Sequence, residues 1–152
     1  MLAPSDAAAR GFLRRSLVVH LATLSSKRRP FVTPLWFALH RGVLYITTGP
    51  ETRAGKNIQQ HSEVTLLFNG ERARRRDQVL RVRGTATCHR GLPPWPALLR
   101  IVAKYYLSPR ALRAELRNAR KWRLRALYHG KAEGGDGHVQ VLPGECEFLT
   151  RP

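Results

Sequence analysis

Five short segments of this chain are rich in β-branched and aliphatic residues, and few residues separate the first three. The segments are residues 17–24, 31–39, 43–48, 63–68 and 78–87. This pattern predicts strands, and in the last segment apolar and polar residues alternate as in a half-exposed strand. Because the first two connections are short, we expect the first three strands to form an antiparallel meander.

Three details within and after these strands carry further predictions. Pro34 lacks a backbone N–H, so we expect its strand to lie at an edge or to contain a bulge. Arg41–Gly42 predicts a tight turn between the second and third strands. Residues 138–142 and 146–150 predict a final hairpin that turns at Pro143–Gly144.

Short helices are expected between these strands. A leading helix is predicted over residues 6–15 with Ser5 as its N-cap, and a second helix within residues 51–61. Residues 93–107 have apolar residues at helical spacing, and Ser108–Pro109 starts a further basic helix. The chain is therefore expected to form one domain over residues 1–152. Its fold class is mainly β or α+β, with a largely antiparallel barrel of six to seven strands and small inserted helices.

The chain is strongly basic, with 27 Lys and Arg against 10 Asp and Glu and a formal net charge of +17 at pH 7. A charge of this size attracts phosphorylated cofactors, nucleic acids and acidic surfaces alike. Arginines crowd residues 72–83 and 110–125. Three interpretations fit these arginine-rich stretches: a solvated surface, an electrostatic funnel for an anionic ligand, or a nucleic-acid site. Since no known recognition motif supports the last, nucleic acid is not expected as a partner.

Several classes of protein are not expected. Cys88 and Cys146 are predicted to be free thiols, and no spacing of ligands predicts a metal site. No apolar run approaches the ~18 residues that span a bilayer, and no signal peptide is visible. We therefore expect no membrane association and a cytoplasmic location. The six histidines are scattered, and no Ser-His-Asp arrangement predicts catalytic residues.

Residues 47–57 predict a phosphate site. The N-terminus of a helix offers unpaired N–H groups and a partial positive charge. Arg53 and Lys56 add full charges at that point, and Thr47, Thr48 and Thr52 add hydroxyl donors. The alternative is a solvated basic helix start whose threonines serve strand propensity.

An ordered series of motifs resembles the pyridoxamine-phosphate-oxidase-like superfamily of flavin-binding split barrels. The matching stretches are His20–Thr23, Phe31–Phe37, Tyr45–Thr48, Thr52–Arg53 and Asn57–Leu66, and the C-terminal half matches only in layout. The resemblance implies an antiparallel split β-barrel. It also implies a homodimer with two cofactors in grooves along the interface.

The resemblance also implies which residues hold the cofactor. The phosphate would lie between the threonine that ends the third strand and the basic helix start. The ring would meet the second strand, chiefly through backbone groups. The candidate residues are Thr33, Pro34, Leu35, Trp36, Thr47, Thr48, Thr52, Arg53, Lys56 and Asn57. The family usually has Lys immediately after the Arg, whereas this chain has Ala54 there, with Lys56 as a substitute.

By this resemblance the chain is expected to be an FMN-dependent oxidoreductase with an unidentified small-molecule substrate. The deazaflavin F420 is the alternative cofactor, and a cofactor-free protein that binds nucleic acid or another polyanion is a second alternative. Residues 147–152 lack the Trp- and Arg-containing tail of authentic pyridoxamine phosphate oxidases. Oxidation of vitamin B6 is therefore not expected.

Overall fold

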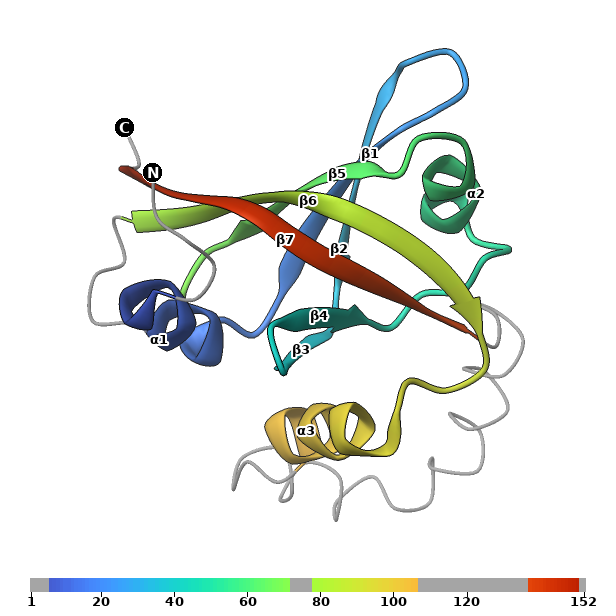
Figure 1. Cartoon of the computed structure of the whole chain (residues 1–152). Coiled ribbons are helices and arrows are strands. Elements are labelled where there is room, and N and C mark those ends of the chain that lie inside the picture. The colour runs from blue at the N-terminus through green and yellow to red at the C-terminus, as the bar shows by residue number, and fades with distance from the viewer. Residues whose placement is uncertain (1–5, 72–77, 107–136, 151–152) are drawn as a thin grey trace, which may run out of the picture.

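The computed structural model describes residues 6–71, 78–106 and 137–150, which form a strongly curled sheet with three helices around it (Figure 1). In chain order the elements are α1 (Ala7–Arg15), β1 (Val19–Leu24), β2 (Pro30–Leu35), β3 (Phe37–His40), β4 (Val43–Ile46), α2 (Arg53–Gln60), β5 (Glu63–Phe68), β6 (Gln78–Arg90), α3 (Trp95–Tyr106) and β7 (Gly137–Thr150). This confirms the mostly β fold class. None of the described helices is long and apolar enough to cross a membrane.

The second predicted strand is split in two at Trp36. The sheet order is β2-β1-β5-β6-β7-β4-β3, so the two halves, β2 and β3, lie at opposite edges of the sheet. Because one residue links these edges, the sheet must curl until they meet, which gives a split barrel. The two antiparallel pairings of the predicted meander are confirmed, since β2 pairs with β1 and β3 pairs with β4, but its middle strand is not continuous. The edge position predicted from Pro34 is confirmed.

The predicted C-terminal hairpin is wrong, because β7 is one continuous strand. It pairs with β6 in antiparallel register from Gln78↔Thr150 to Arg90↔Gly137. Pro143–Gly144 forms a bulge opposite Gly84, where the register shifts between Arg83 and Gly84. A Cβ on Gly84 would lie 2.4 Å from the carbonyl oxygen of Leu142, so only glycine fits at this bend.

The core fills the inside of the curled sheet. Leu21, Leu66, Val82 and Val141 are fully buried there, and the rings of Phe37 and Phe68 meet edge to face at 4.8 Å between their centroids. Ala9, Phe12 and Leu13 of α1 belong to the same core.

α1 closes one end of the barrel. Its Phe12 ring meets Phe148 of β7 edge to face, at 5.4 Å between centroids. The N-cap of α1 is Asp6 rather than the predicted Ser5, because the Asp6 carboxylate accepts the N–H of Ala8 at 2.7 Å.

Tyr105 of α3 lies at the point where the strand splits. Its ring stacks on Trp36 with 4.6 Å between centroids. Its hydroxyl accepts the N–H of Phe37 at 3.1 Å and donates to the carbonyl of Leu17. One side chain therefore joins the start of β3 to the residues that lead into β1, and satisfies backbone groups that the break in the ladder leaves unpaired.

α2 is held against β1 by a buried polar contact. The Asn57 amide donates to the Thr23 hydroxyl at 2.9 Å, and both residues are buried. Gly55 lets the helix approach the preceding loop, since a Cβ there would lie 2.2 Å from the carbonyl oxygen of Gly49. The predicted helix after Ser108 and both arginine-rich stretches, except residues 78–83, lie outside the described residues.

We expect Tyr105→Phe to lower the free energy of unfolding by about 1–3 kcal/mol, because it leaves the Phe37 N–H without its acceptor. The ring stack on Trp36 is retained in this variant, so Trp fluorescence of the native state is expected to change little. Urea denaturation measures the difference. Unchanged stability would show that the hydroxyl does not support the split.

The Thr23–Asn57 contact is tested by a double-mutant cycle with Thr23→Val and Asn57→Ala. Each single change removes one partner of a buried hydrogen bond, so we expect a coupling energy of about 0.5–1.5 kcal/mol between them. Additive effects in thermal or urea unfolding would contradict this tether.

Candidate cofactor-binding site

The first turn of α2 presents two exposed cations, Arg53 and Lys56. The helix begins after Thr52, whose hydroxyl oxygen accepts the N–H of Gly55 at 3.0 Å. Among the described residues, the N–H groups of Arg53 and Ala54 have no hydrogen-bond partner. This end of α2 therefore combines two full positive charges with two unpaired amides, a donor set suited to a phosphate.

The Lys expected after Arg53 is replaced by a residue that faces the core. Ala54 is only 3% exposed, so a charged side chain at this position would not point to solvent in this helix. Lys56, two residues on, is exposed. The helix phase thus explains how the second charge is supplied from position 56 instead of position 54.

Two of the predicted threonines are used inside the loop before α2. The Thr52 hydroxyl donates to the carbonyl of Gly49 at 2.8 Å, and it lies 3.0 Å from the hydroxyl of Thr48. Since each hydroxyl has one proton, Thr48 is the donor in the second contact. Both protons therefore hold the loop, and neither is available to a ligand in this arrangement.

Thr47 joins this loop to the split strand. Its N–H donates to the carbonyl of Trp36 at 3.1 Å, and its hydroxyl points to the same oxygen at 3.4 Å. Asn57 is occupied by its contact with Thr23. Thr47 therefore holds the loop before α2 against the split strand, and Asn57 holds α2 against β1.

The remaining candidates lie along β2, next to α2. The Arg53 guanidinium lies over the Phe31 ring, 4.7 Å from its centroid, at one end of β2, while Thr47 contacts Trp36 at the other end. Pro34 is exposed, Leu35 is half-buried, and Trp36 is 40% exposed. The structure therefore brings the candidate residues to one edge strand and the loop and helix beside it.

Thr33 has an unused polar group. Its Oγ1 is buried and has no hydrogen-bond partner among the described residues. Thr33 pairs with the fully buried Leu21, so its side chain shares the inward face of β2. Buried hydroxyls usually have a partner, so this oxygen is a place where a ligand group or a water would be stabilised.

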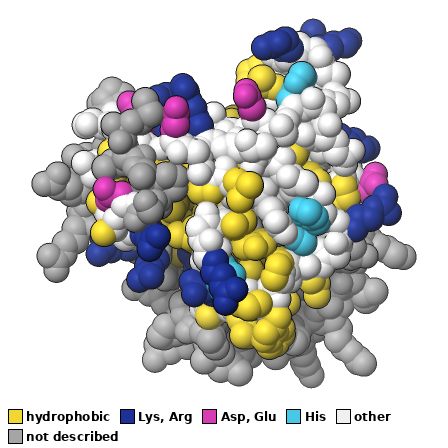
Figure 2. All heavy atoms as spheres, viewed as in Figure 1, with side chains coloured by type: hydrophobic (Ala, Val, Ile, Leu, Met, Phe, Trp, Pro, Cys, Tyr) yellow, Lys and Arg dark blue, Asp and Glu magenta, His cyan; other side chains and the backbone are white. Residues whose placement is uncertain are grey.

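The electrostatic surroundings favour an anion at the start of α2. Glu51, just before the helix, is paired with Arg90 at 3.2 Å on the surface, so its charge is partly offset. The face shown in Figure 2 has an exposed apolar strip, with separate groups of Lys and Arg side chains and several acidic side chains elsewhere on it.

The described residues offer neither a reactive cysteine nor a metal centre. Both cysteines are free, as predicted, and burial raises the pKa of the Cys88 and Cys146 thiols. At neutral pH they are therefore protonated and weakly nucleophilic. No group of three metal-ligating side chains gathers among the described residues.

Two residues of this site are not among the candidates predicted from the sequence, although Phe31 begins the stretch that was expected to flank the ring. Phe31 lies under Arg53, and Tyr105 fixes the ring of Trp36. The aromatic at position 31 directly follows Pro30 at the start of an edge strand, which is a weak signal for a contact surface. Nothing in the sequence links Tyr105 to Trp36, because the contact depends on how α3 returns to the barrel.

Comparison with solved structures shows the same fold in proteins of low sequence identity. A conserved hypothetical protein from Mycobacterium tuberculosis matches with a TM-score of 0.66 and 14% identity, over 96% of this chain and 84% of that chain. A protein titled F420 reductase matches with a TM-score of 0.56 and 23% identity, over 91% and 94%. The heme storage protein HutZ from Vibrio cholerae matches with a TM-score of 0.56 and 13% identity, over 95% and 93%. No curated protein sequence matches the chain.

The sequence itself matches a family model. The model described as pyridoxamine 5'-phosphate oxidase covers residues 5–127, which include α1, the split strand, the basic start of α2 and α3. The family resemblance drawn from the motifs is thereby confirmed. This chain belongs to the pyridoxamine 5'-phosphate oxidase family of split barrels.

Proposed function

We propose that this chain is a homodimeric oxidoreductase that binds FMN and acts on a small molecule still to be identified. The observation that carries the proposal is the pairing of Arg53 and Lys56, both exposed, with the unpaired N–H groups that begin α2. Charge-assisted contacts of this kind contribute about 1.5–3 kcal/mol each to binding. The family match supports the choice of a flavin.

The residues present fit FMN at its phosphate. Arg53 and Lys56 would hold the phosphate, with the amides of Arg53 and Ala54. Thr47, Thr48, Thr52 and Asn57 would support this end of α2 through the hydrogen bonds they already make. In this proposal the polar groups of β2 from Thr33 to Trp36, including the unpartnered Thr33 hydroxyl, would face the ring.

A bound flavin would itself supply the transfer of electrons or hydride, which explains why no acid–base pair is required of the protein. The chain contributes position and charge. Arg53, stacked on Phe31, is held in a fixed place at the edge of β2, and Tyr105 limits the movement of Trp36. The substrate would then bind beside a cofactor whose two ends are fixed by different elements.

A second subunit would complete the groove. β2 is an edge strand, and Val32 on it is 54% exposed while Trp36 next to it is 40% exposed. Pro30 and Pro34 remove N–H groups from this strand, so a partner would pack against its side chains rather than extend the sheet. An apolar edge of this kind is suited to a dimer contact.

F420 is the alternative cofactor, and a solved structure with this fold is titled F420 reductase. The net charge of +17 favours a cofactor with an acidic tail. Oxidation of pyridoxamine phosphate is not proposed. A cofactor-free protein that binds nucleic acid or another polyanion is the outcome expected if neither cofactor binds.

We expect purified protein to bind FMN, with Arg53→Ala/Lys56→Ala weakening binding at least about tenfold, because two charged contacts to the phosphate are lost. Quenching of flavin fluorescence measures the affinity, and the absorbance spectrum distinguishes flavin, F420 and heme. Riboflavin, which lacks the phosphate, should bind wild type and variant alike.

Arg15→Ala/Lys27→Ala is the matched control, since it removes one Arg and one Lys from exposed positions on α1 and in the turn between β1 and β2, outside the candidate residues at α2. It should bind FMN as wild type does. If the α2 variant keeps full affinity, or both variants weaken binding equally, the phosphate is not held at α2.

A further inference from the structure

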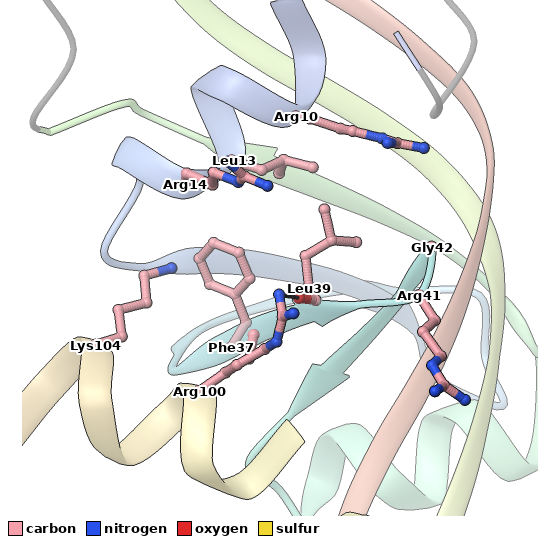
Figure 3. Close-up of a pocket in the computed structure, with 10 residues that line it drawn as sticks. Arg10, Leu13, Arg14, Phe37, Leu39, Arg41, Gly42, Arg100 and Lys104 are labelled. Atoms are coloured by element: carbon pink, nitrogen blue, oxygen red, sulfur yellow. Dashed lines mark hydrogen bonds between the residues drawn. The ribbon is translucent and has the colours of Figure 1, made fainter. Parts of the chain in front are cut away.

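A second basic hollow lies between α1, α3 and the turn that joins β3 to β4 (Figure 3). Its volume is about 410 Å³, which is in the range of pockets for small ligands, roughly 300–1,000 Å³. Its lining shares no residue with the candidate cofactor site. The lining consists of Arg10, Leu13, Arg14, Phe37, Ala38, Leu39, Arg41, Gly42, Arg100 and Lys104.

The cations of this hollow come from both helices. In Figure 3, Arg10 and Arg14 extend from α1 on one side, and Arg100 and Lys104 rise from α3 on the other. Arg41 lies at the rim, in the turn. Among the described residues of the lining there is no Asp or Glu.

The two α3 cations are fixed on an apolar floor. Arg100 donates to the carbonyl of Leu39 at 3.1 Å, and the Lys104 ammonium lies over the Phe37 ring, 3.5 Å from its centroid. Because these side chains are already held in place, a ligand would not have to order them, and binding would cost less entropy. The α1 side differs, because Arg10 and Arg14 are exposed and form no ion pair with any described residue.

The positive potential of this region reaches a neighbouring titratable group. His40 lies between Leu39 and Arg41 in the sequence, and its Nδ1 is buried with no hydrogen-bond partner among the described residues. Burial, followed by the charges of Arg100 and Arg41, lowers the pKa of His40 below its usual value. A bound anion would offset these charges and move the pKa of His40 upward.

We propose that this hollow binds a small organic anion, with a dianionic head between the α1 and α3 cations and a compact apolar body against Ala38 and Leu39. The charge set selects for the head, because several like charges converge and the described part of the lining contains no carboxylate. The floor selects for the body, since the half-buried Leu39 and its neighbour Ala38 line the hollow with carbon. A phosphate monoester and a dicarboxylate both meet this description.

The test uses 1-naphthyl phosphate as the probe, in the Arg53→Ala/Lys56→Ala background so that α2 does not compete for the phosphate. We expect one probe per chain to bind, measured by calorimetry. Inorganic phosphate, which has the head alone, and 1-naphthol, which has the body alone, should bind at least about tenfold more weakly. The His40 ring resonance should titrate at higher pH when the probe is bound. Succinate then distinguishes a carboxylate site from a phosphate site.

Arg10→Gln/Arg14→Gln should weaken probe binding at least about tenfold, because it removes the unpaired half of the charge set. Arg10→Lys/Arg14→Lys should retain most of the affinity. The matched control is Arg15→Gln/Arg29→Gln, which removes the same charge from exposed positions outside the lining. Circular dichroism checks that each variant is folded.

Equal loss of binding in the Arg10/Arg14 variant and the control would overturn the proposal, as would a His40 titration that the probe does not move. Equal affinity for inorganic phosphate and 1-naphthyl phosphate would also overturn it, because the apolar floor would then contribute nothing. These outcomes do not depend on FMN binding at α2, because the background variant lacks Arg53 and Lys56 in every measurement.

Discussion

The contact between the split strand and Tyr105 is the constraint on which the rest of the structure depends. A sheet whose two edges are joined by a single residue has to close on itself, and the backbone at the join cannot pair in a regular ladder. The Tyr105 hydroxyl supplies the missing partner, and its ring covers Trp36. Closure of the barrel therefore depends on a helix that lies far along the chain.

This closure also places the two basic regions of the described structure. β2 leads from the start of α2 to the split, so Arg53 meets Phe31 on that strand. β3 leads away from the split, and its residues 37–39 form the floor of the second hollow, under α3. The two regions thus lie on opposite halves of one interrupted strand. Arg53 of α2 reaches β2 at Phe31, whereas α3 packs directly against β3.

Among the described residues, cations in ion pairs and cations without them lie in different parts of the structure. The ion pairs among the described residues, such as Arg81 with Glu147, are partly exposed and add little stability. Arg53 and Lys56 at α2, and Arg10 and Arg14 at the second hollow, form no ion pair with any described residue. Unpaired charges cost little in water, and they are available for ligands.

Local pattern alone located most elements of this fold. Alternating and β-branched runs marked the strands, and β5 was predicted at its observed bounds. The motifs from His20 to Leu66 identified the family. Both succeeded because these signals reside in neighbouring residues. The split at Trp36, the continuous β7 and the second hollow depended on contacts between distant segments. Pro143–Gly144 suits a turn or a bulge equally, and pairing with β6 chose the bulge. Likewise, the packing of the loop, rather than residue type, decided that Thr48 and Thr52 hold each other.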